Sequence, residues 1–264
     1  MRRNVDALTI VGWGMLLMPL LTMWHEIGGH AAFCAAQGGH VATIGAFYVD
    51  CRGLTGTPRL LMSCAGVLVN ILLAIAAYAC WRRAKGDRLR LFLWLLWVSE
   101  AFVASGYFLF SGVTGVGDLG TGTNGSLSSL PMPLLIRVAE VAIGGIAYWM
   151  CVLAGSKALT AMLGSGPETR RDRRAIAHIY YATAGLGAVV VGLMNPLGIF
   201  ITIMSAAASS FGGLAGFISI GYANPPEGQA SGFELKRNWA VVALGAAALA
   251  AFAVLLGPSI HFPA

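Results

Sequence analysis

Residues 7–37 read ALTIVGWGMLLMPLLTMWHEIGGHAAFCAAQ, and this stretch decides the class of fold. It carries no charged residue before Glu26, and about 20 apolar residues in a helix are enough to cross a bilayer. The apolar run is longer than the roughly 7–15 residues of a signal-peptide core. We therefore predict a first membrane span, with Arg2 and Arg3 as its cytoplasmic anchor.

The composition of the whole chain also indicates a membrane protein. Of the 264 residues, 57% are hydrophobic and 11% are charged, whereas soluble domains carry about 25% charged residues. The mean hydropathy is +0.75. The net charge of +6 comes from short basic clusters between apolar runs. That pattern is typical of cytoplasmic loops and does not indicate a nucleic-acid partner.

Further apolar runs of span length occupy residues 59–81, 91–110, 133–163, 175–194, 197–222 and 239–256. With the first span they predict an all-α, polytopic transmembrane helix bundle of about seven spans, within a range of roughly six to eight. A cytoplasmic N-terminus places the later basic clusters on the cytoplasmic side as well. The short loops suit a multi-pass protein of a prokaryotic plasma (inner) membrane.

A short β element is expected after the first span. Residues 41–49 are rich in β-branched and aromatic side chains, and Gly38, Gly39 and Gly53 flank them. This composition favours a strand or hairpin arm on the outer side of the membrane. The alternative is a membrane-surface loop with aromatic anchors.

The cysteines predict no covalent framework. The chain has five of them, an odd number, and no two form a C-x-x-C pair. Most lie in apolar runs, where a thiol behaves as a small hydrophobic group. We expect neither a disulfide framework nor a cysteine metal site.

Residues 25–30 read HEIGGH, which we interpret as an H-E-x-x-H metal-binding element. Histidines four residues apart share one face of a helix, so His25 and His30 are expected to bind one zinc ion. Glu26 is then placed to take a proton from a zinc-bound water. Gly28 and Gly29 either let a backbone or substrate approach the metal, or serve helix packing. The alternative for the whole element is a hydrogen-bonded polar cluster or proton path.

A catalytic zinc needs a third protein ligand, and the chain offers few. Asp118 is the first choice, because it stands among glycines just past the third span; the alternative is a turn-forming role. Glu100, within the third span, is the second choice, unless it serves an interhelical hydrogen bond. Asn70, within the second span, is expected either to bind substrate near the zinc or to hydrogen-bond across helices.

These residues resemble the site-2 protease family of intramembrane zinc metalloproteases. The likeness consists of the His25, Glu26 and His30 element, then Ala65 and Gly66 followed by Asn70 in the next span, then an aspartate near a later helix. It covers roughly residues 15–120. Val67 stands where the family usually has proline, and Leu119 follows the aspartate where the family has glycine.

The resemblance implies that His25, His30 and Asp118 bind one Zn²⁺ and that Glu26 is the catalytic base. It also implies that Asn70 positions substrate. We therefore expect residues 1–125 to form the metalloprotease core, and residues 126–264 to add transmembrane helices of unknown function.

The expected function is a zinc metalloendopeptidase that cleaves a membrane-spanning protein substrate. Residues 41–49 would offer that substrate a strand edge. The expected partners are thus a membrane protein and the lipid bilayer, with no nucleic acid, and the oligomeric state is left open. The alternatives are a non-proteolytic zinc-binding scaffold and a metal or proton transporter.

Overall fold

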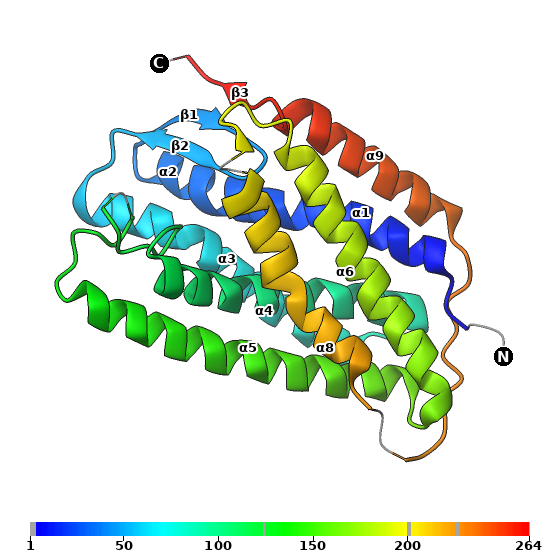
Figure 1. Ribbon diagram of the computed structural model, residues 1–264. Helices are drawn as coiled ribbons and strands as arrows, with labels where there is room; N and C mark the ends of the chain where they lie inside the picture. Colours follow the sequence, from blue (N-terminus) through cyan, green and yellow to red (C-terminus); the bar gives the residue numbers. More distant parts are fainter. Residues whose placement is uncertain (1–3, 124, 200–201, 225–226, 264) are drawn as a thin grey trace.

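A bundle of long helices carries a small sheet at one end (Figure 1). The computed structural model describes residues 4–123, 125–199, 202–224 and 227–263. Six helical stretches in these ranges are long and apolar enough to cross a membrane, by length and composition: Ala7–Ala36, Gly56–Arg83, Asp87–Thr114, Pro133–Leu163, Pro167–Gly192 and Trp239–Leu256. The predicted all-helical class with a short β element is confirmed.

The first stretch consists of three helical segments in direct succession. They are α1 (Ala7–Met23), the π-helix η1 (Trp24–Ala31) and α2 (Ala32–Ala36). Asp6 caps the start of α1, because its carboxylate accepts a hydrogen bond of 2.9 Å from the backbone N–H of Thr9. The longer helices that follow are α3 (Gly56–Arg83), α4 (Asp87–Thr114), α5 (Pro133–Leu163), α6 (Arg170–Gly192, after a 3₁₀ turn at Pro167–Thr169) and α9 (Trp239–Leu256).

The span predicted at residues 197–222 is not one regular helix. Its described part is a π-helix η3 (Thr202–Gly212), a 3₁₀ turn η4 (Gly213–Ala215) and the short helix α8 (Gly216–Tyr222); residues 200 and 201 lie outside the described ranges. The chain still follows α6 from the sheet end to the opposite end of the bundle (Figure 1). The described residues therefore contain six long apolar helices and one broken helical segment, where seven spans were expected.

A tyrosine on α5 satisfies the backbone at the break. The hydroxyl of Tyr148 donates to the carbonyl of Gly213 at 2.9 Å and accepts from the N–H of Gly216 at 2.6 Å. Backbone groups that leave the helical pattern inside an apolar bundle need such partners. A hydropathy count registers only the apolar residues, so it cannot locate the break.

The sheet contains three antiparallel strands in the order β2-β1-β3. The hairpin strands are β1 (His40–Ile44) and β2 (Val49–Arg52), and β3 (Ile260–His261) pairs with the other side of β1. The strand predicted at residues 41–49 is therefore a hairpin. Strand β1 is paired on both sides, so it has no free edge. The free edge on the hairpin side of the sheet belongs to β2.

A disulfide joins Cys34 of α2 to Cys51 of β2, with their Cα atoms 6.1 Å apart. The prediction of no disulfide was wrong. An odd cysteine count and the apolar surroundings of Cys34 do not reveal that the hairpin folds back onto the first helical stretch. The bond fixes the edge strand to the helix that follows η1.

One hydrophobic core joins the N-terminal and C-terminal parts of the chain. Within the bundle α4 packs against α3 and α5, while α1 packs against α6 and α9. Aromatic side chains fill the centre, and the fully buried ones include Trp94, Phe102, Tyr180 and Phe217. By contrast α5 exposes a long apolar face, as a helix facing lipid would: Leu134, Leu135, Val138, Ile146, Trp149 and Leu153.

Candidate metal centre

His25 and His30 both lie on the π-helix η1, and they are five residues apart. The expected four-residue spacing of H-E-x-x-H was therefore wrong. In an α-helix, which turns about 100° per residue, side chains five apart would point about 140° away from each other. A π-helix pairs residue i with i+5, so here the fifth residue returns to the same face. The two Nε2 atoms lie 3.1 Å apart.

The two glycines between the histidines have different surroundings. A Cβ on Gly29 would lie 2.7 Å from Cα of Gly66 in α3, so η1 and α3 touch backbone to backbone. A Cβ on Gly28 would lie 3.2 Å from the ring of Trp24. The contact at Gly29 fits both roles expected for this pair, because it packs η1 closely against α3 and brings the α3 backbone to the histidines.

Asp118 reaches the histidines from the loop that follows α4. Gly115 ends α4 in the left-handed conformation, with φ of 73°. The N–H of Gly122 then donates to the carbonyl of Gly115 at 2.9 Å and closes the turn. Oδ2 of Asp118 lies 3.0 Å from Nε2 of His25 and 3.3 Å from Nε2 of His30.

These three side chains can hold a metal ion. Their donor atoms all lie within 4.8 Å of one another, and both histidines are buried. Burial opposes ionisation of Asp118, but the charges and hydrogen bonds of His30 and His25 hold its pKa well below its usual range. The group supplies two imidazole nitrogens and a carboxylate, a donor set that suits a divalent metal. Glu100, the second choice for the third ligand, is not part of this group.

A glycine on α3 forms the wall of the centre. A Cβ on Gly66 would lie 2.4 Å from Nε2 of His25 and 2.6 Å from Nε2 of His30. Only a residue without a side chain leaves the space between the ligand atoms open. No pattern in the sequence predicts this role of Gly66, although it belongs to the Ala65-Gly66 pair of the family likeness.

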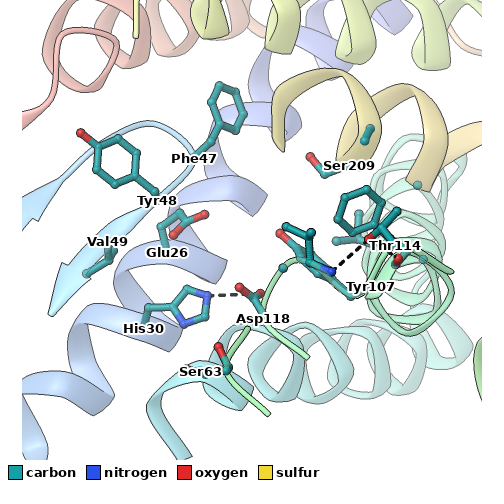
Figure 2. A pocket seen from close by; sticks show the side chains of 18 of the residues that line it. Glu26, His30, Phe47, Tyr48, Val49, Ser63, Tyr107, Thr114, Asp118 and Ser209 are labelled. Atoms are coloured by element: carbon teal, nitrogen blue, oxygen red, sulfur yellow. Dashed lines mark hydrogen bonds and ion pairs between the residues drawn. The ribbon is translucent and has the colours of Figure 1, made fainter. Parts of the chain in front are cut away.

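Glu26 lies beside the metal group without belonging to it. Its side chain is buried, and its Oε2 has no hydrogen-bond partner among the described residues. With His30 and Asp118 it lines a cavity of about 970 Å³. Figure 2 shows Glu26, His30 and Asp118 around this cavity, with the ion pair between His30 and Asp118 marked. The glutamate is therefore available for chemistry in the cavity.

Both halves of the chain line the cavity. Its walls come from the hairpin, from α4 and the loop after it, from α5 and from the η3–η4 segment; they include Tyr48, Val49, Asp50, Tyr107, Phe110, Tyr148, Ser209 and Gly213. The ring of Tyr107 also stacks on His25, with the ring centres 4.8 Å apart. Neither Tyr107 nor the C-terminal residues of the cavity lie in a recognisable motif, so their contribution could not be predicted from the sequence.

Asn70 lies behind His25, away from the large cavity. It is 1% exposed, and its side-chain amide lies within hydrogen-bond distance of Nδ1 of His25. It does not line the cavity that contains Glu26 and Asp118. This placement favours a role in orienting His25 over the predicted contact with substrate.

The comparisons with known proteins identify no relative. No family model, no curated protein and no solved structure matches the chain. The likeness to the site-2 protease family therefore stays a prediction, and only the geometry of the candidate metal centre supports a function.

Proposed function

We propose that this chain is an intramembrane zinc metalloprotease, with zinc held by His25, His30 and Asp118 and with Glu26 as the general base. One observation carries the proposal. Two buried histidines and the partly exposed Asp118 form a nitrogen–nitrogen–oxygen donor set at the wall of a peptide-sized cavity, beside Glu26, whose Oε2 has no hydrogen-bond partner in the described part of the chain. Catalytic zinc sites typically use three protein ligands and leave one position for water or substrate.

The chemistry divides between the metal and the chain. Bound zinc would supply a Lewis acid that lowers the pKa of water to about 7. Glu26 takes the proton of the attacking water and then delivers it to the leaving amine. Its buried position keeps bulk water from competing for that proton.

The free edge of β2 supports an extended peptide as the substrate. Val49, Asp50 and Cys51 line the same cavity as Glu26, and a peptide can add to such an edge through main-chain hydrogen bonds. The disulfide to Cys34 holds this edge at a fixed place relative to the metal helix. A membrane-spanning protein with an unwound segment fits a cavity enclosed by apolar helices.

Charge and cysteine chemistry support one orientation in the membrane. The disulfide lies at the sheet end of the bundle, and disulfides persist in oxidising compartments outside the cytoplasm. The opposite end carries most of the basic residues: Arg82, Arg83, Lys85, Arg88, Arg170, Arg171, Arg174, Lys236 and Arg237. Positive residues favour the cytoplasmic side. We accordingly propose a multi-pass protein of a prokaryotic inner membrane, with the N-terminus inside.

The test is cleavage of a single-span reporter protein co-reconstituted with the chain in liposomes, with zinc per chain measured on the same samples. Wild type is expected to cleave, and Glu26→Gln to lose roughly 10²–10⁴-fold in rate while keeping its zinc. Glu227→Gln, which changes an exposed glutamate, serves as the matched control and should cleave like wild type.

Two outcomes would reject the protease. Zinc-loaded wild type that cleaves no peptide bond, or no faster than Glu26→Gln, would favour the non-proteolytic scaffold. Movement of zinc or protons across the liposome wall that depends on Glu26 would favour the transporter.

A further inference from the structure

The two histidines can bind a metal through Nε2 only if their Nδ1 atoms carry the hydrogen. In both rings Nε2 faces the other donor atoms of the metal group. A neutral imidazole has one N–H, so the metal-binding tautomer needs an acceptor at Nδ1. For His30 the acceptor is the backbone carbonyl of Met62, at 2.9 Å. A backbone acceptor fixes this ring without help from any other side chain.

For His25 the acceptor is a side chain, whose own orientation has to be set. The oxygen of the Asn70 amide accepts from Nδ1 of His25 at 3.1 Å. The amide nitrogen then donates to Oε2 of Glu100 and to the carbonyl of Gly66, both at 3.1 Å. In the opposite orientation the amide oxygen would face two acceptors, so Glu100 and Gly66 together decide which way Asn70 points.

Glu100 has no other role that the described residues reveal. It is 1% exposed on α4, and it forms no salt bridge within the described part of the chain. It is not a ligand of the metal group and does not line the large cavity. An acidic side chain inside an apolar bundle is costly, which points to a function for its contact with Asn70.

We propose that Glu100 is a positioning residue that acts through Asn70 to hold His25 in its metal-binding tautomer. The chain of contacts runs from α4 through α3 to η1, so three helical elements must be in register before the ring is fixed. The inference rests on the metal centre of the proposed function, but not on peptide hydrolysis. Hydrogen-bond partners of a ligating histidine are typically worth about 10–100-fold in metal affinity.

The experiment measures zinc affinity of the detergent-purified full chain by chelator competition, without any substrate. Glu100→Leu is expected to weaken binding about 10–100-fold, whereas Glu100→Gln keeps an acceptor oxygen and should stay near wild type. The matched control is Glu140→Leu, which removes another buried glutamate that lies outside both the metal group and the large cavity. It should leave zinc affinity unchanged.

A pair of polar substitutions tests the direction of the hydrogen bonds. Asn70→Asp still accepts from His25 but faces Glu100 with a second carboxylate, so it should weaken zinc binding. Adding Glu100→Gln supplies an amide donor to that carboxylate and should recover part of the loss. A merely structural role for Glu100 predicts no such rescue. In cobalt-loaded protein the absorption bands should shift in Asn70→Asp and return in the double variant.

Three results would overturn the proposal that Glu100 acts through Asn70 on His25. They are wild-type zinc affinity in Glu100→Leu, an equal loss in Glu140→Leu, and a double variant no better than Asn70→Asp. If Glu100→Leu does not fold, the two polar variants still decide the question. If the wild type binds zinc but cleaves no peptide, the protease is rejected and the positioning role of Glu100 is not affected. If the wild type cleaves but these variants keep wild-type zinc affinity, the positioning role is rejected and the protease is not affected.

Discussion

At the scale of single residues, the metal centre depends on an absent side chain as much as on its ligands. Gly66 brings the backbone of α3 against both ligating nitrogens, and Gly29 lets η1 approach that backbone. A Cβ on Gly66 would lie 2.4 and 2.6 Å from the two Nε2 atoms, well inside van der Waals contact. A methyl group there would occupy space close to the ion.

Gly66→Ala is therefore expected to abolish stoichiometric metal binding. Gly145→Ala on α5 is the control, because a Cβ there meets only a leucine side chain at 3.8 Å. The measurement is zinc per chain in purified protein, together with the thermal unfolding midpoint of the metal-free form. A folded Gly66→Ala protein that holds one zinc like wild type would show that the backbone of Gly66 does not lie this close to the two histidine nitrogens.

Part of this centre could be predicted from single residues. His25, His30 and Asp118 are polar groups in apolar or glycine-rich surroundings, and such groups are costly unless they have partners. Gly66 and the orientation of Asn70 could not be predicted, because both depend on which turn of α3 faces η1. That contact joins residues about 40 positions apart, and no local pattern encodes it.

At the scale of elements, the π-helix explains how histidines five residues apart can share one face and one candidate metal site. The chain has one residue more between the histidines than the H-E-x-x-H pattern. In an α-helix this extra residue would turn His30 away from His25, but the wider turn of the π-helix η1 accommodates it. Hydropathy and periodicity describe this stretch as continuous helix. The five-residue spacing is visible in the sequence itself, so the H-E-x-x-H interpretation misread it. What hydropathy and periodicity cannot show is the change of helical pitch that lets the two histidines share a face, as was predicted.

Deletion of Gly28 should keep metal binding, because it restores a four-residue spacing that suits an α-helix. The matched variant is deletion of Ala31, which removes one residue from the same segment but leaves the histidines five apart. That variant should lose the metal if η1 relaxes to an α-helix. Zinc content of both folded proteins is the measurement, and equal affinities in the two would argue against any role of the π-helix in the spacing.

At the scale of the whole molecule, the number of times the chain runs along the bundle determines where its two ends lie. Near the N-terminus, Asp6 bonds to the backbone of Leu235 at the end opposite the sheet, whereas Ile260 and His261 belong to the sheet. Figure 1 places N and C at opposite ends of the bundle. The η3–α8 segment thus adds one more pass along the bundle in the described part of the chain, although it fails a simple length and hydropathy test.

Epitope tags on the two ends test this topology in intact spheroplasts. Protease added outside should digest a C-terminal tag at once and reach an N-terminal tag only after the membrane is permeabilised. Detection of each tag with and without detergent is the measurement. If both tags are protected or both are digested, the number of crossings is even, and the η3–α8 segment does not traverse the bilayer.

The wide separation of the ligands along the chain has a consequence for biosynthesis. Asp118 follows His25 by 93 residues, which a ribosome adding about 5–20 residues per second takes roughly 5–20 s to translate. During that interval the two imidazoles have left the ribosome before the carboxylate that completes the centre exists. A metal ion held by all three side chains would therefore be acquired late in the life of the nascent chain, after α4 and its following loop have been made.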